Sequence, residues 1–91
     1  MINQETIIAL ATPNGLGAIS VIRISGLNAI SVTEKLFKPK GNKKLSDQNS
    51  HTVHLGHLMK KSHELDEVLV TVFKGPHSYT GENTIEISCH G

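Results

Sequence analysis

The chain has 91 residues, a formal net charge of +1 and a hydrophobic fraction of 37%, with two Phe, one Tyr and no Trp. This length suits one small domain, whose core must be built from Val, Ile and Leu. The charge balance gives no electrostatic argument for a nucleic acid or a membrane as partner, and no apolar stretch approaches the roughly 20 residues needed to span a bilayer.

The two ends of the chain and its cysteine bear on location. Residues 1–10 lack a basic region followed by an apolar run, so we expect no secretory signal. Cys89 is the single cysteine and cannot form an internal disulfide, which fits a reducing compartment and predicts a cytoplasmic protein. Because a predicted strand ends one residue before Gly91, we also expect the chain to be a fragment of a longer protein.

Two strands and one helix are predicted in the first half of the chain. The apolar run Thr6–Ala11 predicts a short buried strand, and the Gly-rich segment Thr12–Ala18 predicts a loop. Ile19–Ser25 is rich in β-branched residues and partly apolar on both faces, which predicts an inner strand covered on both sides. Asn28 is a suitable N-cap for a helix over Ala29–Phe37, which the Pro and Gly that follow would end.

The second half predicts three more strands separated by polar segments. Residues 40–50 show no hydrophobic period and predict a loop, and residues 60–65 suit a hairpin connection. The predicted strands are Thr52–Met59, Glu67–Phe73 and Thr84–His90, with a second breaker-rich loop over Gly75–Asn83. This order is not an alternating βαβ pattern. It favours an α+β fold, a two-layer sandwich with a mixed, mostly antiparallel five-stranded sheet and a helix on one face.

Five lysines gather in one short stretch: Lys35, Lys38, Lys40, Lys43 and Lys44. A face that binds tRNA would need such local clustering of positive charge. A solvated loop rich in Lys, Asn and Ser accounts for the same pattern, and this is the favoured interpretation.

Two sequence patterns, a Gly-Leu-Gly segment and a group of three histidines, raise the question of a bound phosphate or metal. Gly15-Leu16-Gly17 precedes a strand rather than a helix, and no Gly-Lys-Ser/Thr is present, which argues against a nucleoside triphosphate site in this chain. His51, His54 and His57 would alternate between the two faces of a strand, so one metal ion cannot easily bind all three. We therefore expect no metal site.

Two possible nucleophile pairs are also poor. Cys89 and His90 are adjacent on a predicted strand and would point to opposite faces, and Cys89 is more typical of a small core residue. His77 and Ser78 lie in a loop without an identifiable third partner. We expect no catalytic residue in the chain.

Arg23 and Glu86 are charges placed inside predicted strands rather than at strand ends. Charged residues are rarely buried unless they are paired, so Arg23 points either at solvent, the commoner outcome, or at a partner. If the two strands are neighbours, the two side chains form a structural ion pair. The functional alternative is a planar polar ligand held by both, because a carboxylate accepts two parallel N–H donors and Arg offers a matching fork.

The sequence resembles the N-terminal domain of the MnmE (TrmE) family of tRNA-modifying GTPases. The resemblance covers nearly the whole chain in order and spacing, and only residues 40–65 are generic. It rests on residues 11–26, ATPNGLGAISVIRISG, and on Glu34–Phe37, Asp66–Val70, Gly75–Asn83 and Glu86–Gly91.

The resemblance implies a fold, a cofactor and two site residues. The fold would be similar to the tetrahydrofolate-binding part of the glycine-cleavage aminomethyltransferase. The cofactor would be a reduced folate such as 5-formyltetrahydrofolate, the one-carbon source, bound near a homodimer interface. Arg23 and Glu86 match the family's folate contacts by motif, and a further basic contact would lie beyond Gly91.

The resemblance also implies partners and further domains. In the family a helical domain follows, with an inserted GTPase domain that binds GTP, Mg²⁺ and K⁺. The full protein works with the flavoprotein MnmG to modify the wobble uridine of tRNA by a carboxymethylaminomethyl-type addition. Residues 1–91 would then be the N-terminal tetrahydrofolate-binding and dimerisation domain, with the helical and GTPase domains absent.

Two departures from the family pattern bear on function. The family's first loop more often reads Pro-Pro-Gly-Arg-Gly, whereas Asn14 and Leu16 replace the second proline and the arginine here, so a cationic contact from position 16 is lost. The family's GTPase motifs and C-terminal cysteine motif are not in these residues. We therefore expect neither GTP hydrolysis nor tRNA modification from this chain alone.

Three functions are compatible with the sequence. The chain is a folate-binding and dimerising domain of a tRNA-modifying enzyme, a dimerisation scaffold that binds no folate, or an independent enzyme similar to an aminomethyltransferase. The chain is too short for an independent aminomethyltransferase-like enzyme. The folate-binding domain and the scaffold differ only in whether a folate is bound.

Overall fold

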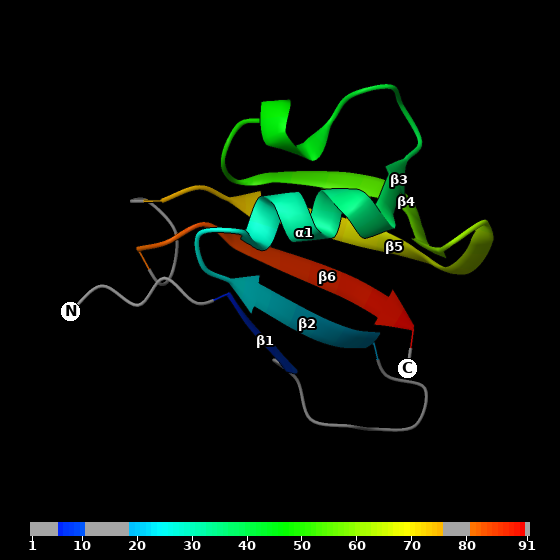
Figure 1. The fold of residues 1–91 in the computed structure, drawn as a ribbon, viewed down its shortest axis with the longest axis horizontal. Coiled ribbons are helices and arrows are strands. Elements are labelled where there is room, and N and C mark those ends of the chain that lie inside the picture. The colour runs from blue at the N-terminus through cyan, green and yellow to red at the C-terminus, as the bar shows by residue number, and fades with distance from the viewer. Residues whose placement is uncertain (1–5, 11–18, 76–80, 91) are drawn as a thin grey trace.

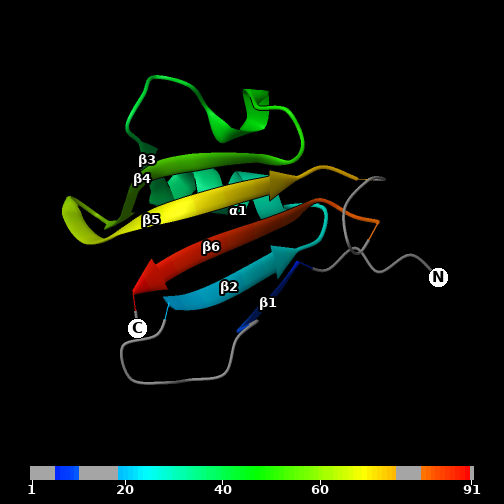
Figure 2. The same cartoon turned by 180° about the vertical axis from the view of Figure 1, so that it is seen from behind.

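The computed structural model describes residues 6–10, 19–75 and 81–90. They form a sheet with the strand order β1-β2-β6-β5-β4-β3 and one α-helix that packs across one face (Figure 1). In the view from behind, no described element covers the opposite face, called here the open face (Figure 2). The elements are β1 (Ile7–Leu10), β2 (Ile19–Ser25), α1 (Ala29–Leu36), β3 (Phe37–Pro39), the 3₁₀ turn η1 (Leu45–Asp47), β4 (Thr52–Lys60), β5 (His63–Phe73) and β6 (Thr84–His90).

The α+β class with a helix on one face is confirmed, but the prediction of five strands is wrong. The sheet has six strands, and all five neighbouring pairs are antiparallel. The additional strand is β3, which follows α1 directly and pairs Phe37 with Leu58 of β4. The helix therefore ends at Leu36, one residue earlier than predicted. Pro39 lacks a backbone N–H and is tolerated because β3 lies at the edge of the sheet.

The helix carries the chain from one half of the sheet to the other. It begins after β2 and delivers the chain to β3 at the far edge, so it crosses the faces of β6, β5 and β4 (Figure 1). Its buried side chains are Ala29, Ile30 and Thr33, and the Thr33 hydroxyl donates to the carbonyl oxygen of Ala29 at 2.8 Å. Asn28 occupies the predicted N-cap position without a side-chain capping bond. No helix in the described part of the chain has the length and apolarity needed to cross a membrane.

The core lies between α1 and the three middle strands. Cross-strand rows Ile24–Ile85–Val72 and Ile22–Ile87–Val70 run under the helix, since alternate residues of β2, β6 and β5 face it. The buried apolar residues are Ile24, Ala29, Ile30, Phe37, Leu45, Val68, Val70, Val72, Ile85 and Ile87. As predicted, Val, Ile and Leu make up most of this core, and Phe37 is the one aromatic residue among the buried side chains of the described residues.

Part of the predicted polar loop over residues 40–50 contributes to this core. Leu45 is the first residue of η1 and is 2% exposed. The neighbouring backbone N–H of Ser46 donates to Glu34 Oε2 on α1 at 2.9 Å, which ties η1 to the helix. A single apolar residue has no period, so the sequence pattern could not indicate its burial.

Two strand assignments also differ from prediction. The N-terminal strand exists as β1, but its four residues are exposed, because β1 is an edge strand that lies beyond the strands crossed by α1. The polar connection over residues 60–65 shrinks to the turn at Lys61 and Ser62, where Lys61 has a φ of 56°. The rest of that segment joins β4 and β5, because backbone pairing accepts the polar side chains at exposed strand ends.

Asn83 fixes the base of the second predicted loop. Its side-chain oxygen accepts the backbone N–H of Gly75 at 3.0 Å, and its carbonyl oxygen accepts the N–H of Gly26 at 3.0 Å. These bonds connect the end of β5, the start of β6 and the β2–α1 junction. The predicted loop over 12–18, with Asn14 and Leu16, and the pair His77-Ser78 lie outside the described residues.

Gly56 on β4 leaves the space that the Phe37 ring occupies. A Cβ at this position would lie 2.5 Å from Cζ of Phe37 and even closer to the carbonyl oxygen of Lys38. We expect Gly56→Ala to lower the free energy of unfolding by about 2 kcal/mol, because the added methyl group overpacks the β3–β4 contact. Chemical denaturation measures this change.

The control for this variant is Gly41→Ala. A Cβ at Gly41 would meet no atom within 4 Å, so this substitution should not destabilise the chain. Equal stability of the two variants would contradict the packing of Phe37 over Gly56.

Cys89 packs against the core from β6, on the face predicted for it. Its thiol donates to the carbonyl oxygen of Ser20 at 3.6 Å. Burial, with a smaller contribution from the Asp66 carboxylate, raises the pKa of the Cys89 thiol. The fraction of reactive thiolate is therefore lowered at every pH below that pKa.

We expect iodoacetamide to alkylate Cys89 several-fold more slowly at pH 8 in the folded chain than in the chain unfolded by urea. The physical reason is the smaller thiolate fraction together with restricted access. Mass spectrometry of timed samples gives both rates, and equal rates would contradict the assigned position of Cys89.

Candidate functional site

Arg23 and Glu86 are direct cross-strand partners at the centre of the open face. Arg23 lies on β2 and Glu86 on β6, and the register pairs the two residues. Their chain neighbours Ile24, Ile85 and Ile87 face the helix, so alternation turns Arg23 and Glu86 to the other side. The structure thus brings together both site residues that the sequence singled out.

The two side chains form a short ion pair. The Nε and Nη2 atoms of Arg23 donate to the same oxygen, Oε2 of Glu86, at 3.0 and 2.6 Å. The side chains are 34% and 25% exposed. The expectation that Arg23 points only at solvent is therefore wrong, and the alternative of a structural ion pair is present.

One oxygen of Glu86 remains available to a ligand. Both donated bonds end on Oε2, and within the described residues Oε1 accepts no hydrogen bond. A carboxylate oxygen has two lone pairs, so Oε1 can accept one or two N–H donors without disturbing Arg23. A ligand that binds both carboxylate oxygens would instead displace Arg23 from Oε2.

A small side chain flanks the pair on each side, and apolar side chains lie further along β4 and β5. The row that contains the pair runs Ala9, Arg23, Glu86, Thr71 and Val53 across five strands. The next row runs Val21, Ser88, Leu69 and Leu55. Ala9 and Thr71 have small side chains beside the charges, whereas Val53, Leu55 and Leu69 are exposed apolar side chains. A flat molecule with polar edges fits such a surface.

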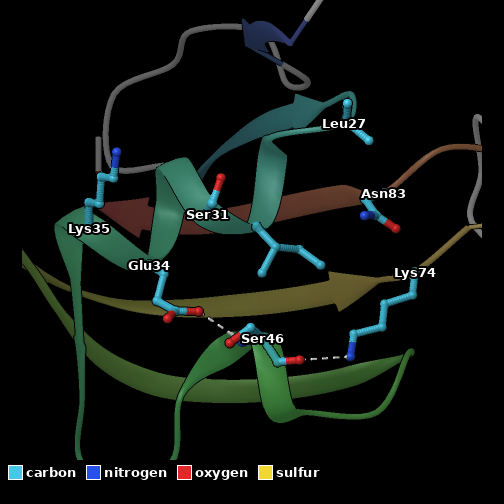
Figure 3. A pocket seen from close by; sticks show the side chains of 8 residues that line it. Leu27, Ser31, Glu34, Lys35, Ser46, Lys74 and Asn83 are labelled. Carbon is cyan, nitrogen blue, oxygen red and sulfur yellow. Dashed lines mark hydrogen bonds between the residues drawn. The ribbon is translucent and has the colours of Figure 1, made fainter. Parts of the chain in front are cut away.

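A hollow lies on the helix side of the sheet and does not include the pair. It has a volume of about 630 Å³ and is lined by Leu27, Ile30, Ser31, Glu34, Lys35, Ser46, Lys74 and Asn83. Figure 3 shows the ammonium group of Lys74 and the carboxylate of Glu34 meeting at Ser46. Lys74 Nζ donates to the carbonyl oxygen of Ser46 at 3.1 Å. Sequence reasoning did not identify this hollow, because its walls come from segments far apart in the chain.

The three histidines considered for a metal have separate neighbours. The ring of His51 meets Phe73 edge-on at 5.1 Å, and Nε2 of His54 lies 2.8 Å from the Thr52 hydroxyl. Nδ1 of His57 contacts Oε1 of Glu64 across the β4–β5 pair. In residues 6–10, 19–75 and 81–90, no three His, Cys, Asp or Glu side chains come together in a way that could hold one ion.

Comparison with known proteins identifies the family. Residues 6–91 match the family described as GTP-binding protein TrmE N-terminus. The tRNA modification GTPase MnmE of Flavobacterium johnsoniae is 64% identical over 91 residues, which are the whole of this chain and 20% of that protein. The protein of the same name from Flavobacterium psychrophilum is 58% identical over 91 residues, which are 100% of this chain and 20% of that protein. The one from Bacteroides thetaiotaomicron is 51% identical over 90 residues, which are 98% of this chain and 19% of that protein.

The match confirms the resemblance to the MnmE (TrmE) family that was inferred from the sequence motifs. The chain spans about a fifth of the length of the relatives that it matches. On the match over residues 6–91, the chain belongs to the family of the N-terminal domain of the GTP-binding protein TrmE, whose relatives here carry the name tRNA modification GTPase MnmE.

Proposed function

We propose that residues 1–91 form a tetrahydrofolate-binding and dimerising domain of a tRNA-modifying GTPase. The observation that carries the folate part is the Arg23–Glu86 pair, which lies between Ala9 and Thr71 on the open face. Family membership supports the remainder, since relatives up to 64% identical are tRNA modification GTPases. A fold similar to the tetrahydrofolate-binding part of an aminomethyltransferase belongs to the same proposal.

A pterin has the chemistry that this face can bind. Its ring carries an amino group next to a ring N–H, and Oε1 of Glu86 can accept from this edge. The guanidinium of Arg23 can meet the pterin carbonyl or the carboxylates of the folate tail. The exposed side chains of Leu55 and Leu69 offer an apolar surface to the rest of a flat ligand.

The rest of the proposed activity lies outside these residues. GTP with Mg²⁺ and K⁺ would bind in a GTPase domain elsewhere in the protein, and the flavoprotein MnmG would be the partner in modification of the wobble uridine. The protein would act in the cytoplasm as a homodimer, with the reduced folate as one-carbon donor. Residues 1–91 would contribute no catalytic group of their own.

A dimerisation scaffold without folate is the second candidate. Glu86 already has a charged partner in Arg23, which satisfies the pair without a ligand. Val53, Leu55 and Leu69 are exposed by 59, 39 and 44% on the same face, which is typical of a surface that another protein covers. The two candidates differ in whether Glu86 contacts a folate.

Calorimetric titration of 5-formyltetrahydrofolate into the chain tests the folate site. We expect saturable binding that Glu86→Gln weakens about thirtyfold, or about 2 kcal/mol, because the amide loses a charged acceptor opposite the pterin donors. Glu67→Gln is the matched control, since it makes the same change at an exposed carboxylate of β5, and it should bind as the unmodified chain does.

The free energy of unfolding of each variant is measured in parallel. This measurement separates weaker folate binding from a loss of stability caused by removal of the Arg23–Glu86 ion pair. Equal affinity of Glu86→Gln and the unmodified chain would remove Glu86 from the site. Absence of binding by all three proteins would favour the scaffold.

Sedimentation velocity tests the dimer. We expect the chain to sediment as a dimer, and Leu69→Lys to shift it to monomer by placing a charge among Leu55 and Val53 of the open face. Leu27→Lys, an equally non-conservative change at an exposed leucine on the helix side, should leave the dimer intact. Dissociation by Leu27→Lys alone would place the interface on the other layer.

A further inference from the structure

Seven of the nine Lys and Arg residues of the chain lie along one edge of the molecule. Lys35 is in the last turn of α1, Lys38 is on β3, and Lys60 ends β4. The full set, called here the lysine edge, is Lys35, Lys38, Lys40, Lys43, Lys44, Lys60 and Lys61. In Figure 1 the segments that carry them occupy the same side of the molecule, where α1 ends, β3 pairs with β4 and the chain turns into β5.

This edge is a consequence of the tertiary structure. Lys60 and Lys61 are some 20 residues away from the other five in sequence. The register Phe37↔Leu58 brings β3 against the end of β4, two residues from Lys60. The lysine cluster of residues 35–44 was interpreted from the sequence as part of a solvated loop. The fold places a second basic segment, Lys60 and Lys61, beside it.

The lysines are exposed, and six of the seven form no ion pair within the described residues. All seven side chains are exposed, and the ten residues from Lys35 to Lys44 include no Asp or Glu. Within the described residues, the ion pairs of the structure involve only Lys40 of this set, whose Nζ lies 3.9 Å from Oε2 of Glu67. Acids also lie near this edge, and they include Glu34, Asp47, Glu64 and Glu67. Glu34 accepts the N–H of Ser46 and Glu64 contacts His57, and the seven lysines outnumber these four acids.

The lysine edge also has a concave part. Lys38, Lys40, Lys43 and Lys44 line a hollow of about 470 Å³, and its other lining residues include one acid, Glu34, and the buried side chains of Phe37 and Leu45. Phe37 is 5% exposed, so its ring is not available for a base to stack on. Contact with a nucleic acid here would go through phosphate charges, which position a partner without reading its sequence.

We propose that the lysine edge binds the phosphate backbone of an RNA stem, and that in this protein the RNA is the tRNA on which the enzyme acts. The choice of RNA over another polyanion rests on the proposed function, because the relatives are tRNA modification GTPases. The edge lies at the β3 end of the sheet, four strands from Arg23 on β2, so RNA and folate would contact different parts of the domain.

The test compares binding of fluorescently labelled bulk tRNA by anisotropy at 50 and 200 mM KCl. Lys38→Gln/Lys40→Gln/Lys44→Gln should weaken binding at least about tenfold at 50 mM, and should reduce the slope of log affinity against log salt by about 3, since three phosphate contacts are lost. The same three positions changed to Arg should retain binding, because Arg keeps the charge. Lys74→Gln, the control outside the edge, should change affinity less than about twofold.

Three results would overturn the proposal. These are no tRNA binding by the intact chain, equal binding by the triple Gln variant, or binding to vesicles of phosphatidylserine and phosphatidylcholine in place of tRNA. Titration of 5-formyltetrahydrofolate into the same proteins separates this proposal from the folate proposal. The triple Gln variant should keep any folate binding, whereas Glu86→Gln should keep tRNA binding.

Discussion

Pairing of β6 with both β2 and β5 holds the two halves of this molecule together. β1 and β2 form one half of the sheet and β5, β4 and β3 the other, and β6 is the strand that hydrogen-bonds to both. Its side chains alternate, so Ile85 and Ile87 enter the core while Glu86 stays on the open face. Full burial of each of these isoleucines stabilises the fold by about 1.5 to 3 kcal/mol. The position of the ion pair is thus set by the same alternation that builds the core.

The crossing of α1 determines how the remaining segments are arranged. Because the helix starts at β2 and ends at the opposite edge, β3 is added outside β4 rather than beside β2. Phe37 then packs over Gly56, and Leu45 fills the core beside the helix. This path also leaves the lysines of residues 35–44 on the outside of the edge strand, next to the β4–β5 turn. Because α1 is the only described α-helix, one face of the sheet is covered, and the charged and apolar residues of the open face remain accessible.

The domain separates its chemistry by location. The open face has one Arg–Glu pair in its centre and apolar side chains on the β4–β5 side, which suits a flat polar ligand or a second protein surface. The β3 edge carries most of the positive charge, and its one aromatic residue is buried. The net charge of +1 conceals this separation, since eight acids nearly balance nine bases over the whole chain. Bulk charge is therefore a poor guide to partners in a domain of this size.

Local patterns in the sequence determined the α+β class, the helix and the strands at the centre of the sheet. Val68, Val70 and Val72 alternate with polar or exposed positions, and β-branched residues fill Ile19–Ser25, so backbone preference and burial agree there. Motif spacing also identified the family, and charges inside two strands singled out Arg23 and Glu86. These features depend on neighbours within a few residues, which is why the sequence alone carries them.

Tertiary structure decided the features that depend on distant partners. β3 is three residues long and exists because Gly56 and Leu58 of β4 receive it, and Leu45 is buried because the helix and sheet leave a space for it. β1 is exposed although it is apolar, since it lies at the edge of the sheet beyond the strands that α1 crosses. The direct bond between Arg23 and Glu86 required β2 and β6 to be adjacent in register, and the lysine edge required β3 to pair with β4. Strand order and register are long-range properties, and no local pattern of side chains fixes them.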